Sequence, residues 1–240
     1  MTKLISSARD AVAAITSGSS IAIGGVGLDG VPSALVDALC NSAVEDLEII
    51  SNQTAFDDKG FGRLLADGRV RRMVSPYQGR GIAFPRQHLA GLEVELIQQD
   101  VLSERLRAGG SGIAAFFTST GVSARVADGR LPSKHETAGG VAAGRPLKET
   151  RTFCGTEYVL ERGITVDFAL VRAWKGDRHG NLVYREADRA FNSLCALSAG
   201  VRIAEVEELV EPDDMQVGPV HTPGILINHV FALAPRSEVR

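Results

Sequence analysis

Residues 20–32 read SIAIGGVGLDGVP, and this stretch decides which fold the chain adopts. Ser20 to Ile23 form a short apolar run that is typical of a buried strand. Four glycines follow between positions 24 and 30, and Pro32 stands where the first turn of a helix tolerates a missing N–H. Residues 34–39 supply the apolar face of that helix, and residues 47–50 read as a second buried strand. This order of strand, glycine loop, helix and strand predicts a parallel sheet and an α/β fold.

The alternation of strands and helices continues along the chain. Further strands are predicted at residues 70–74, 92–96, 113–117, 158–160, 168–171, 182–184 and 203–206. Helices are predicted at residues 8–15, 61–66 and 101–108, the last one stopped by Gly109 and Gly110. Residues 126–150 lack periodicity and are predicted to form a surface excursion. We therefore expect a single domain over residues 1–240, built on an open, mostly parallel sheet that is flanked by helices.

Composition restricts the classes of function. The 240 residues are 44% hydrophobic and 23% charged with a net charge of -3, the mix of an ordinary globular protein. The densest basic cluster, Arg69, Arg71 and Arg72, is interpreted as a solvated edge, so no nucleic-acid partner is expected. No stretch approaches the ~18 apolar residues of a membrane span, and no signal-peptide pattern opens the chain. The three cysteines form no metal or redox spacing, which indicates reduced thiols and a cytoplasmic location.

The glycine loop admits more than one interpretation. Residues 25–30 match the dinucleotide pattern G-x-G-x-x-G between a strand and a helix. An NAD site also needs an acidic residue at the end of the second strand, and Ser51 and Asn52 stand there instead. The glycines still allow close approach of the backbone to a ligand, and their N–H groups can face an anion or a developing oxyanion. Alternatively, the loop is a plain turn between strand and helix that binds no ligand. An NAD-dependent oxidoreductase is the least favoured of the functions considered.

Several stretches resemble the A subunits of class I coenzyme A transferases. They cover most of the chain in the order that the family has: residues 21–32, with the double glycine and Pro32; residues 50–52; residues 92–110; residues 167–182, the most specific; and residues 221–225. The chain is similar above all to the 3-oxoacid type, whose members use succinyl-CoA and acids such as acetoacetate. The 3-oxoadipate enzymes are near neighbours. The resemblance implies the open α/β sheet of this family, also called the NagB-like fold.

The resemblance also implies a division of labour between two subunits. In this family a glutamate of the B subunit, in a Ser-Glu-Asn-Gly motif, is the nucleophile, and this chain contains no such motif. We therefore expect no catalytic residue in this chain, no activity without a B subunit, and no metal or cofactor beyond coenzyme A as a substrate. A role in binding CoA or the substrate carries over to six residues that match family positions: Gly24, Gly25, Gly27, Gly30, Asn52 and Gln99. Asn52 can equally be a turn former after its strand.

The sequence departs from the family pattern around the expected acyl site. Val26 stands where a phenylalanine is usual, residues 53–55 differ, and residues 97–100 end in Asp100 where the family has glycine. Asp100 adds a negative charge beside a site for anionic acids, which indicates an altered acyl substrate or reduced activity. Glu104 is interpreted as a surface ion-pair partner rather than a nucleophile. The alternatives left open are a CoA-ester hydrolase or carbon–carbon lyase on the same fold, and a degenerate subunit without catalysis.

Overall fold

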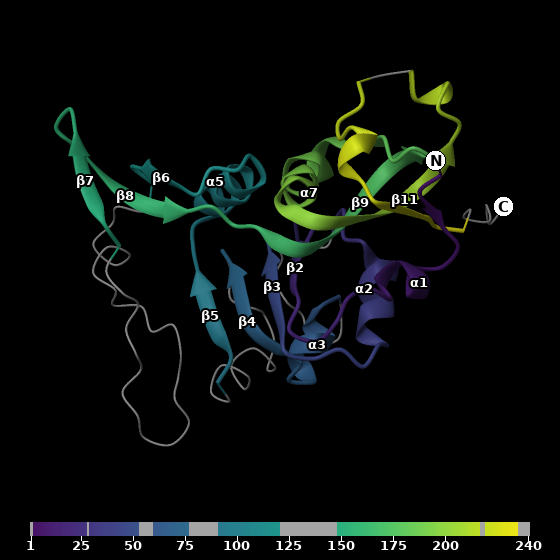
Figure 1. Cartoon of the computed structure of the whole chain (residues 1–240), viewed down its shortest axis with the longest axis horizontal. Helices are drawn as coiled ribbons and strands as arrows, with labels where there is room; N and C mark the ends of the chain where they lie inside the picture. Colours follow the sequence, from purple (N-terminus) through teal and green to yellow (C-terminus); the bar gives the residue numbers. More distant parts are fainter. Residues whose placement is uncertain are drawn as a thin grey trace.

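The computed structural model describes residues 2–27, 29–52, 60–76, 91–120, 148–216 and 219–234, with only the backbone described at residues 186–188 and 216. In this part of the chain a nine-stranded sheet forms the centre of the molecule, in the order β1-β12-β11-β9-β2-β3-β4-β5, with β10 paired to β9 (Figure 1). The strands are β1 (Leu4–Ile5), β2 (Ser20–Ile23), β3 (Leu47–Ser51), β4 (Val70–Ser75), β5 (Glu93–Leu96), β9 (Val166–Asp177), β10 (Leu182–Val183), β11 (Ala199–Val210) and β12 (His229–Ala232).

The pairings along this sheet are parallel, and β10 alone among the described strands of the sheet runs antiparallel to its neighbour. Parallel strands are covered by helices on both faces, so their sequences read as continuous apolar runs rather than alternating ones. The run Ile21, Ala22 and Ile23 in β2 follows this rule, since all three residues are fully buried. The expected open, mostly parallel sheet is confirmed.

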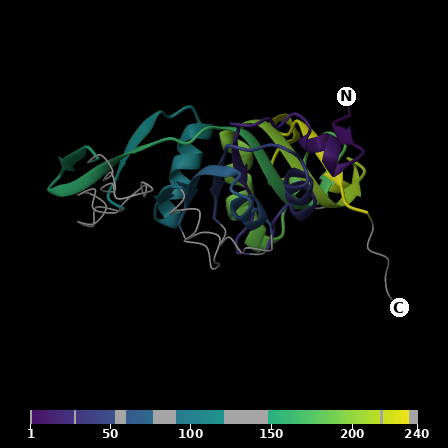
Figure 2. The ribbon, with the colours of Figure 1, turned by 90° about the horizontal axis from the view of Figure 1, so that it is seen from below.

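Helices cover both faces of the sheet (Figures 1 and 2). Because side chains alternate along a strand, Phe168 and Leu170 of β9 pack into one core while Ala169 and Val171 pack into the other. The first core is closed by α1 (Ala8–Val12), α2 (Ser33–Cys40) and α3 (Gly62–Ala66), and the second by α5 (Gln99–Gly110) and α7 (Glu186–Ser198). Two short 3-10 turns, η1 (Asp214–Gln216) and η2 (Gly224–Leu226), precede β12.

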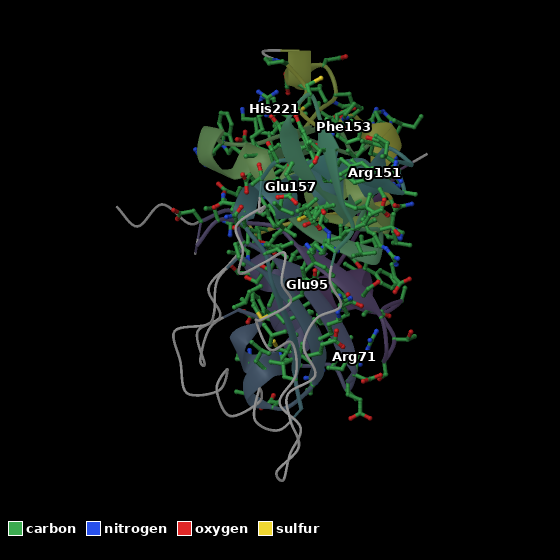
Figure 3. All side chains as sticks on the ribbon, turned by 90° about the vertical axis from the view of Figure 1, so that its left-hand side faces the viewer. Arg71, Glu95, Arg151, Phe153, Glu157 and His221 are labelled. Atoms are coloured by element: carbon green, nitrogen blue, oxygen red, sulfur yellow. The ribbon has the colours of Figure 1, made fainter. Side chains whose placement is uncertain are left out.

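A smaller antiparallel sheet extends beyond α5, away from the main sheet (Figures 1 and 2). It contains β6 (Ala115–Thr118), β7 (Thr150–Phe153) and β8 (Thr156–Arg162) in the order β6-β8-β7. In Figure 3, Arg151 and Phe153 of this sheet are labelled above Glu95 and Arg71 of the main sheet. The surface excursion predicted at residues 126–150 lies largely outside the described residues.

A chain of largely buried ion pairs ties the small sheet to the large one. Arg72 on β4 contacts Glu95 on β5 at 2.6 Å, and Glu95 contacts Arg105 on α5 at 2.7 Å. Arg105 in turn lies 3.9 Å from Glu161 of β8, which also pairs with Lys148. The prediction of a solvated edge is therefore wrong for Arg72.

Of the other two arginines in the cluster, Arg69 is held within the fold and Arg71 is exposed. Arg69 donates to the carbonyl groups of Leu39 and Cys40 at the end of α2 and of Val44 beyond it, so it too is part of the folded structure. Arg71 is exposed and lies 3.7 Å from carboxylate oxygens of Asp46 and Glu48, which fits a solvated edge.

Three expectations about helices need correction. Helix α1 ends at Val12, although Ile15 still packs in the core. Helix α5 runs through Gly109 and ends at Gly110, two residues beyond the predicted end. A Cβ on Gly109 would lie 2.0 Å from the carbonyl oxygen of Ile164. These glycines allow neighbouring backbone to approach the helix closely. Helix α7 was not predicted at all. None of the helices in the described ranges is long and apolar enough to cross a membrane.

Candidate functional site

The carboxyl ends of three parallel strands, β2, β3 and β5, bring most of the predicted site residues to one edge of the sheet. Gly24 and Gly25 follow β2, Asn52 follows β3, and Gln99 comes three residues after β5. Because β2, β3, β4 and β5 are parallel and adjacent in this order, their carboxyl ends lie side by side. Asn52 is therefore next to the glycine loop, whereas Gln99 lies three strands away, about 14 Å by strand spacing.

The glycine loop occupies the point where the order of strands reverses. From β2 the chain moves through β3 and β4 to β5 in one direction, and from β9 it moves through β11 to β12 in the other. The loop after β2 thus lies where the two halves of the sheet diverge. In open α/β sheets, ligands bind at the carboxyl ends of the strands at such a switch point. Fold topology therefore favours a ligand site at the glycine loop.

The loop adopts backbone conformations with positive φ, which favour glycine. Gly25, Gly27 and Gly30 have φ angles of 111°, 63° and 63°, and the backbone groups of Val26 and Asp29 bond each other at 2.9 and 3.1 Å across a tight turn. A Cβ on Gly27 would meet no atom within 4 Å, so conformation rather than packing calls for glycine there. Within the described residues, the N–H groups of Gly25 and Gly27 donate to no other residue, which leaves them available to an oxygen of a ligand.

Gly24 differs from the other loop glycines. Its N–H donates to the carbonyl oxygen of Leu170 on β9 at 2.9 Å, so this donor is used within the fold. A Cβ on Gly24 would lie 1.9 Å from Oδ1 of Asn192 on α7. Close packing therefore requires glycine at position 24, and the substrate-facing role of Gly24, Gly25, Gly27 and Gly30 stays a prediction.

Two charged side chains that the sequence analysis did not single out hold the segment after the loop. Glu205 on β11 is fully buried, and its Oε2 accepts from the N–H groups of Ala34 and Leu35 at 2.8 and 3.1 Å. Arg172 on β9 lies 3.5 Å from Glu205 Oε1 and donates to the carbonyl oxygen of Val31 at 3.3 Å. Burial raises the pKa of Glu205, while the Leu35 N–H and Arg172 oppose that shift. The sequence did contain a sign of these two roles, because Arg172 and Glu205 stand inside the apolar stretches 168–174 and 199–206. Charged residues in such stretches are buried only when they are paired.

Asn52 presents an unsatisfied amide at the end of β3. Its side chain is only 2% exposed, and Oδ1 has no hydrogen-bond partner among the described residues. A buried polar atom without a partner costs about 1–3 kcal/mol, and because Oδ1 is an acceptor, a ligand that donates an N–H or O–H to it would recover this cost. Asn52 therefore remains a candidate for contact with a substrate.

Gln99 and Asp100 form the first turn of α5, at the outer end of the same edge. Both side chains are exposed, and Asp100 Oδ1 accepts from the N–H of Val101 at 2.9 Å. Asp100 thus satisfies a backbone donor of its own helix while its charge stays exposed. Glu104, one turn later, pairs with Arg107 at 2.7 Å, and the two side chains are 49% and 47% exposed. The interpretation of Glu104 as a surface ion-pair partner is confirmed.

The comparisons with known proteins establish the class to which this fold and site belong. The family described as coenzyme A transferase matches residues 5–233. The chain belongs to the coenzyme A transferase family, as the resemblance in its sequence indicated, and it is an enzyme of that kind.

Particular relatives place it more closely. The chain is 55% identical over 231 residues to the A subunit of the probable succinyl-CoA:3-ketoacid coenzyme A transferase of Mycobacterium tuberculosis, covering 96% of this chain and 93% of the relative. Its structure is similar to the acyl-CoA transferase YdiF of Escherichia coli O157:H7, with a TM-score of 0.83 at 20% identity. That match covers 97% of this chain but 47% of YdiF, so the chain spans about half of that longer protein. A variant of the decarboxylase AibA/AibB matches with a TM-score of 0.74 at 27% identity, covering 98% of this chain and 84% of that one.

Proposed function

We propose that this chain is the A subunit of a CoA transferase that moves coenzyme A from succinyl-CoA, or a similar acyl-CoA, to a 3-oxo acid such as acetoacetate. The observation that carries the proposal is the carboxyl edge of the sheet. There, N–H groups of the glycine loop that have no acceptor among the described residues lie beside the unsatisfied amide of Asn52. The high identity to an A subunit of the succinyl-CoA:3-ketoacid type supports the choice of substrates.

The proposed reaction proceeds in two half-reactions through a glutamate of the partner subunit. The carboxylate attacks the acyl-CoA carbonyl, the C–S bond breaks, and a mixed anhydride and free CoA thiolate form. The thiolate then attacks the glutamyl carbonyl, which releases the first acid and leaves CoA as a thioester on the enzyme. The 3-oxo acid reverses these steps and leaves as its CoA ester. No electron or net proton is exchanged, so coenzyme A enters as a substrate and the chemistry calls for no metal or redox cofactor.

In this scheme the proposed role of this chain is to stabilise charge rather than to attack. Each addition to a carbonyl group creates an oxyanion, and donors fixed in advance at its position lower the barrier. The N–H groups of Gly25 and Gly27 are the proposed donors to the oxyanion, and the side-chain NH2 groups of Asn52 and Gln99 are the proposed donors to the carboxylate and oxo oxygens of the acids. A catalytic carboxylate in the partner explains why the chain can lack the Ser-Glu-Asn-Gly motif.

The test uses the full chain alone, a B-type partner alone, and the two combined. We expect acetoacetyl-CoA to form from succinyl-CoA only in the combined sample and only when acetoacetate is present. Robust turnover by the purified chain alone would contradict the proposal.

The same samples distinguish the second candidate. The similarity to the decarboxylase AibA/AibB over 98% of this chain favours a carbon–carbon lyase as the alternative. A lyase would release carbon dioxide from an acyl-CoA without any acceptor, and a hydrolase would release free CoA under the same conditions. Either result without acetoacetate would replace the transferase assignment.

A further inference from the structure

One buried amide side chain joins both ends of the glycine loop to the body of the protein. Asn192 belongs to α7, which packs against β9 and β2 (Figure 1), and it is fully buried. Its Oδ1 accepts from the N–H of Arg172 at 2.9 Å, and its Nδ2 donates to the carbonyl oxygen of Gly30 at 3.1 Å. The far end of the loop is therefore bonded to a side chain that is itself bonded to β9.

The near end of the loop is shaped by the same side chain. A Cβ on Gly24 would lie 1.9 Å from Asn192 Oδ1 and 2.7 Å from its Cγ, both far inside normal contact distance. The absence of a side chain at Gly24 thus lets the amide lie directly against the loop. One residue from α7 sets the position of the loop at its first glycine and at its last.

The segment beyond the loop is held separately. Arg172 bonds the carbonyl oxygen of Val31, and Glu205 bonds the first N–H groups of α2. Between these anchors, the described bonds of the loop backbone are those that Val26 and Asp29 exchange. The direction of the N–H groups of Gly25 and Gly27 therefore depends on where the two ends of the loop are held.

We propose that Asn192 is a positioning residue for the reaction, one that touches no substrate but keeps the N–H groups of Gly25 and Gly27 aimed at the reacting carbonyl oxygen. This inference rests on the proposed function of the loop. Donors to an oxyanion act by being fixed before the charge develops, so a small displacement removes much of their effect. A misplacement of about 1 Å can lower the rate on the order of a hundredfold.

The first test compares two asparagines in the full chain combined with its partner subunit. Asn192→Ala is expected to lower kcat on the order of a hundredfold with little change in the KM for acyl-CoA. Asn228→Ala is the matched control, because Asn228 Oδ1 also accepts from a strand N–H, that of Arg202 at 2.8 Å, near the amino end of β11. The control is expected to keep the kcat of the wild type. Asn192→Asp keeps the acceptor for Arg172 but lacks the donor to Gly30, and it should also lower kcat.

A second measurement separates positioning from general stability. Amide hydrogen exchange across residues 24–32 should accelerate in Asn192→Ala and remain as in the wild type in Asn228→Ala. If Asn192→Ala lowers only the melting temperature, with kcat and loop exchange unchanged in the folded protein, the residue is merely structural and the proposal fails. Exchange is measured without substrate, so this part of the test stands even if the enzyme proves to be a lyase or a hydrolase.

A double-mutant cycle tests the contact itself. Gly24→Ala should lower kcat because its Cβ collides with Asn192, whereas Asn192→Ala removes the atoms that lie nearest to that Cβ. Gly24→Ala should therefore cause little further loss when it is added to Asn192→Ala. Losses that multiply independently would show that the two residues act separately and would overturn the proposal.

Discussion

Two glycines with positive φ, one before β2 and one after it, allow the effect of a substitution on activity to be distinguished from the effect of backbone strain on stability. Gly18 has a φ of 84° before the strand and Gly27 a φ of 63° after it, and a Cβ on either would meet nothing within 4 Å. Gly18→Ala and Gly27→Ala should each lower the free energy of unfolding by about 1–2 kcal/mol, the cost of a left-handed conformation for a residue with a Cβ. We expect kcat/KM to fall in Gly27→Ala and to remain unchanged in Gly18→Ala. Equal activities in the two variants would reduce the loop to a plain turn.

Asp100 is the residue where the sequence departs most sharply from its family. Its exposed carboxylate lies at the edge that is proposed to bind anionic acids, so it should oppose their binding through charge that salt screens. Asp100→Asn removes the charge and keeps an oxygen for the N–H of Val101. We expect this variant to lower the KM for small dicarboxylates at low salt, with the gain shrinking as salt is added.

The control for Asp100 is one helical turn away. Glu104→Gln removes an exposed charge that already pairs with Arg107, and it should leave the KM and its salt dependence unchanged. If Asp100→Asn behaves like this control, Asp100 points away from the acids and the argument for an altered acyl substrate loses its support.

At the scale of elements, helix α2 depends on a carboxylate from a distant strand. Its N-cap residue, Pro32, makes no side-chain bond to the first turn, and Glu205 of β11 accepts from Ala34 and Leu35 instead. Burial raises the pKa of Glu205, so the folded chain binds this proton more tightly than the unfolded chain does. The contribution of Glu205 to stability is therefore greatest at acidic pH and is lost as the pH rises through the folded-state pKa.

Denaturant titrations across pH test this linkage. As the pH is raised from 4.5, the ordinary pKa of the carboxyl group, the wild type should lose stability that Glu205→Gln does not lose. The free energy of unfolding of the variant should therefore rise relative to that of the wild type. A difference between wild type and Glu205→Gln that is constant across this range would show that Glu205 titrates alike in the folded and unfolded chains.

At the scale of the whole molecule, the proposed chemistry places the covalent intermediate on the partner. Borohydride or hydroxylamine added after acyl-CoA reacts with an activated glutamyl thioester or anhydride. Mass spectrometry of the combined subunits should find the modification on a glutamate of the partner and on no residue of this chain. A modified Glu104, or any other modified carboxylate among residues 1–240, would reverse the roles assigned to the two chains.

Short apolar runs in the sequence were enough to predict the α/β fold. Strands buried on both faces need several apolar residues in succession, so β2, β3 and β4 stood out within a residue or so of their observed bounds. The glycine loop was equally clear, because its positive φ angles require a residue type that is visible in the sequence. Asn52 was named only through the resemblance to the family, and it lies on the same edge as the loop because parallel strands share one carboxyl edge.

Residues that act on parts of the chain far away in sequence could be recognised only from tertiary contacts. Gly109 reads as a helix stop, yet α5 runs through it, and Ile164, more than fifty residues later, packs against it. The sequence analysis did not single out Glu205 and Arg172, which bond the first turn of α2 and the carbonyl oxygen of Val31 just after the loop. Asn192 lies so close to Gly24 that a Cβ there would collide with it, a packing reason for glycine that the sequence did not show. Local preference is set by neighbours in sequence, whereas these roles come from contacts that exist only after the chain has packed, so no local pattern could reveal them.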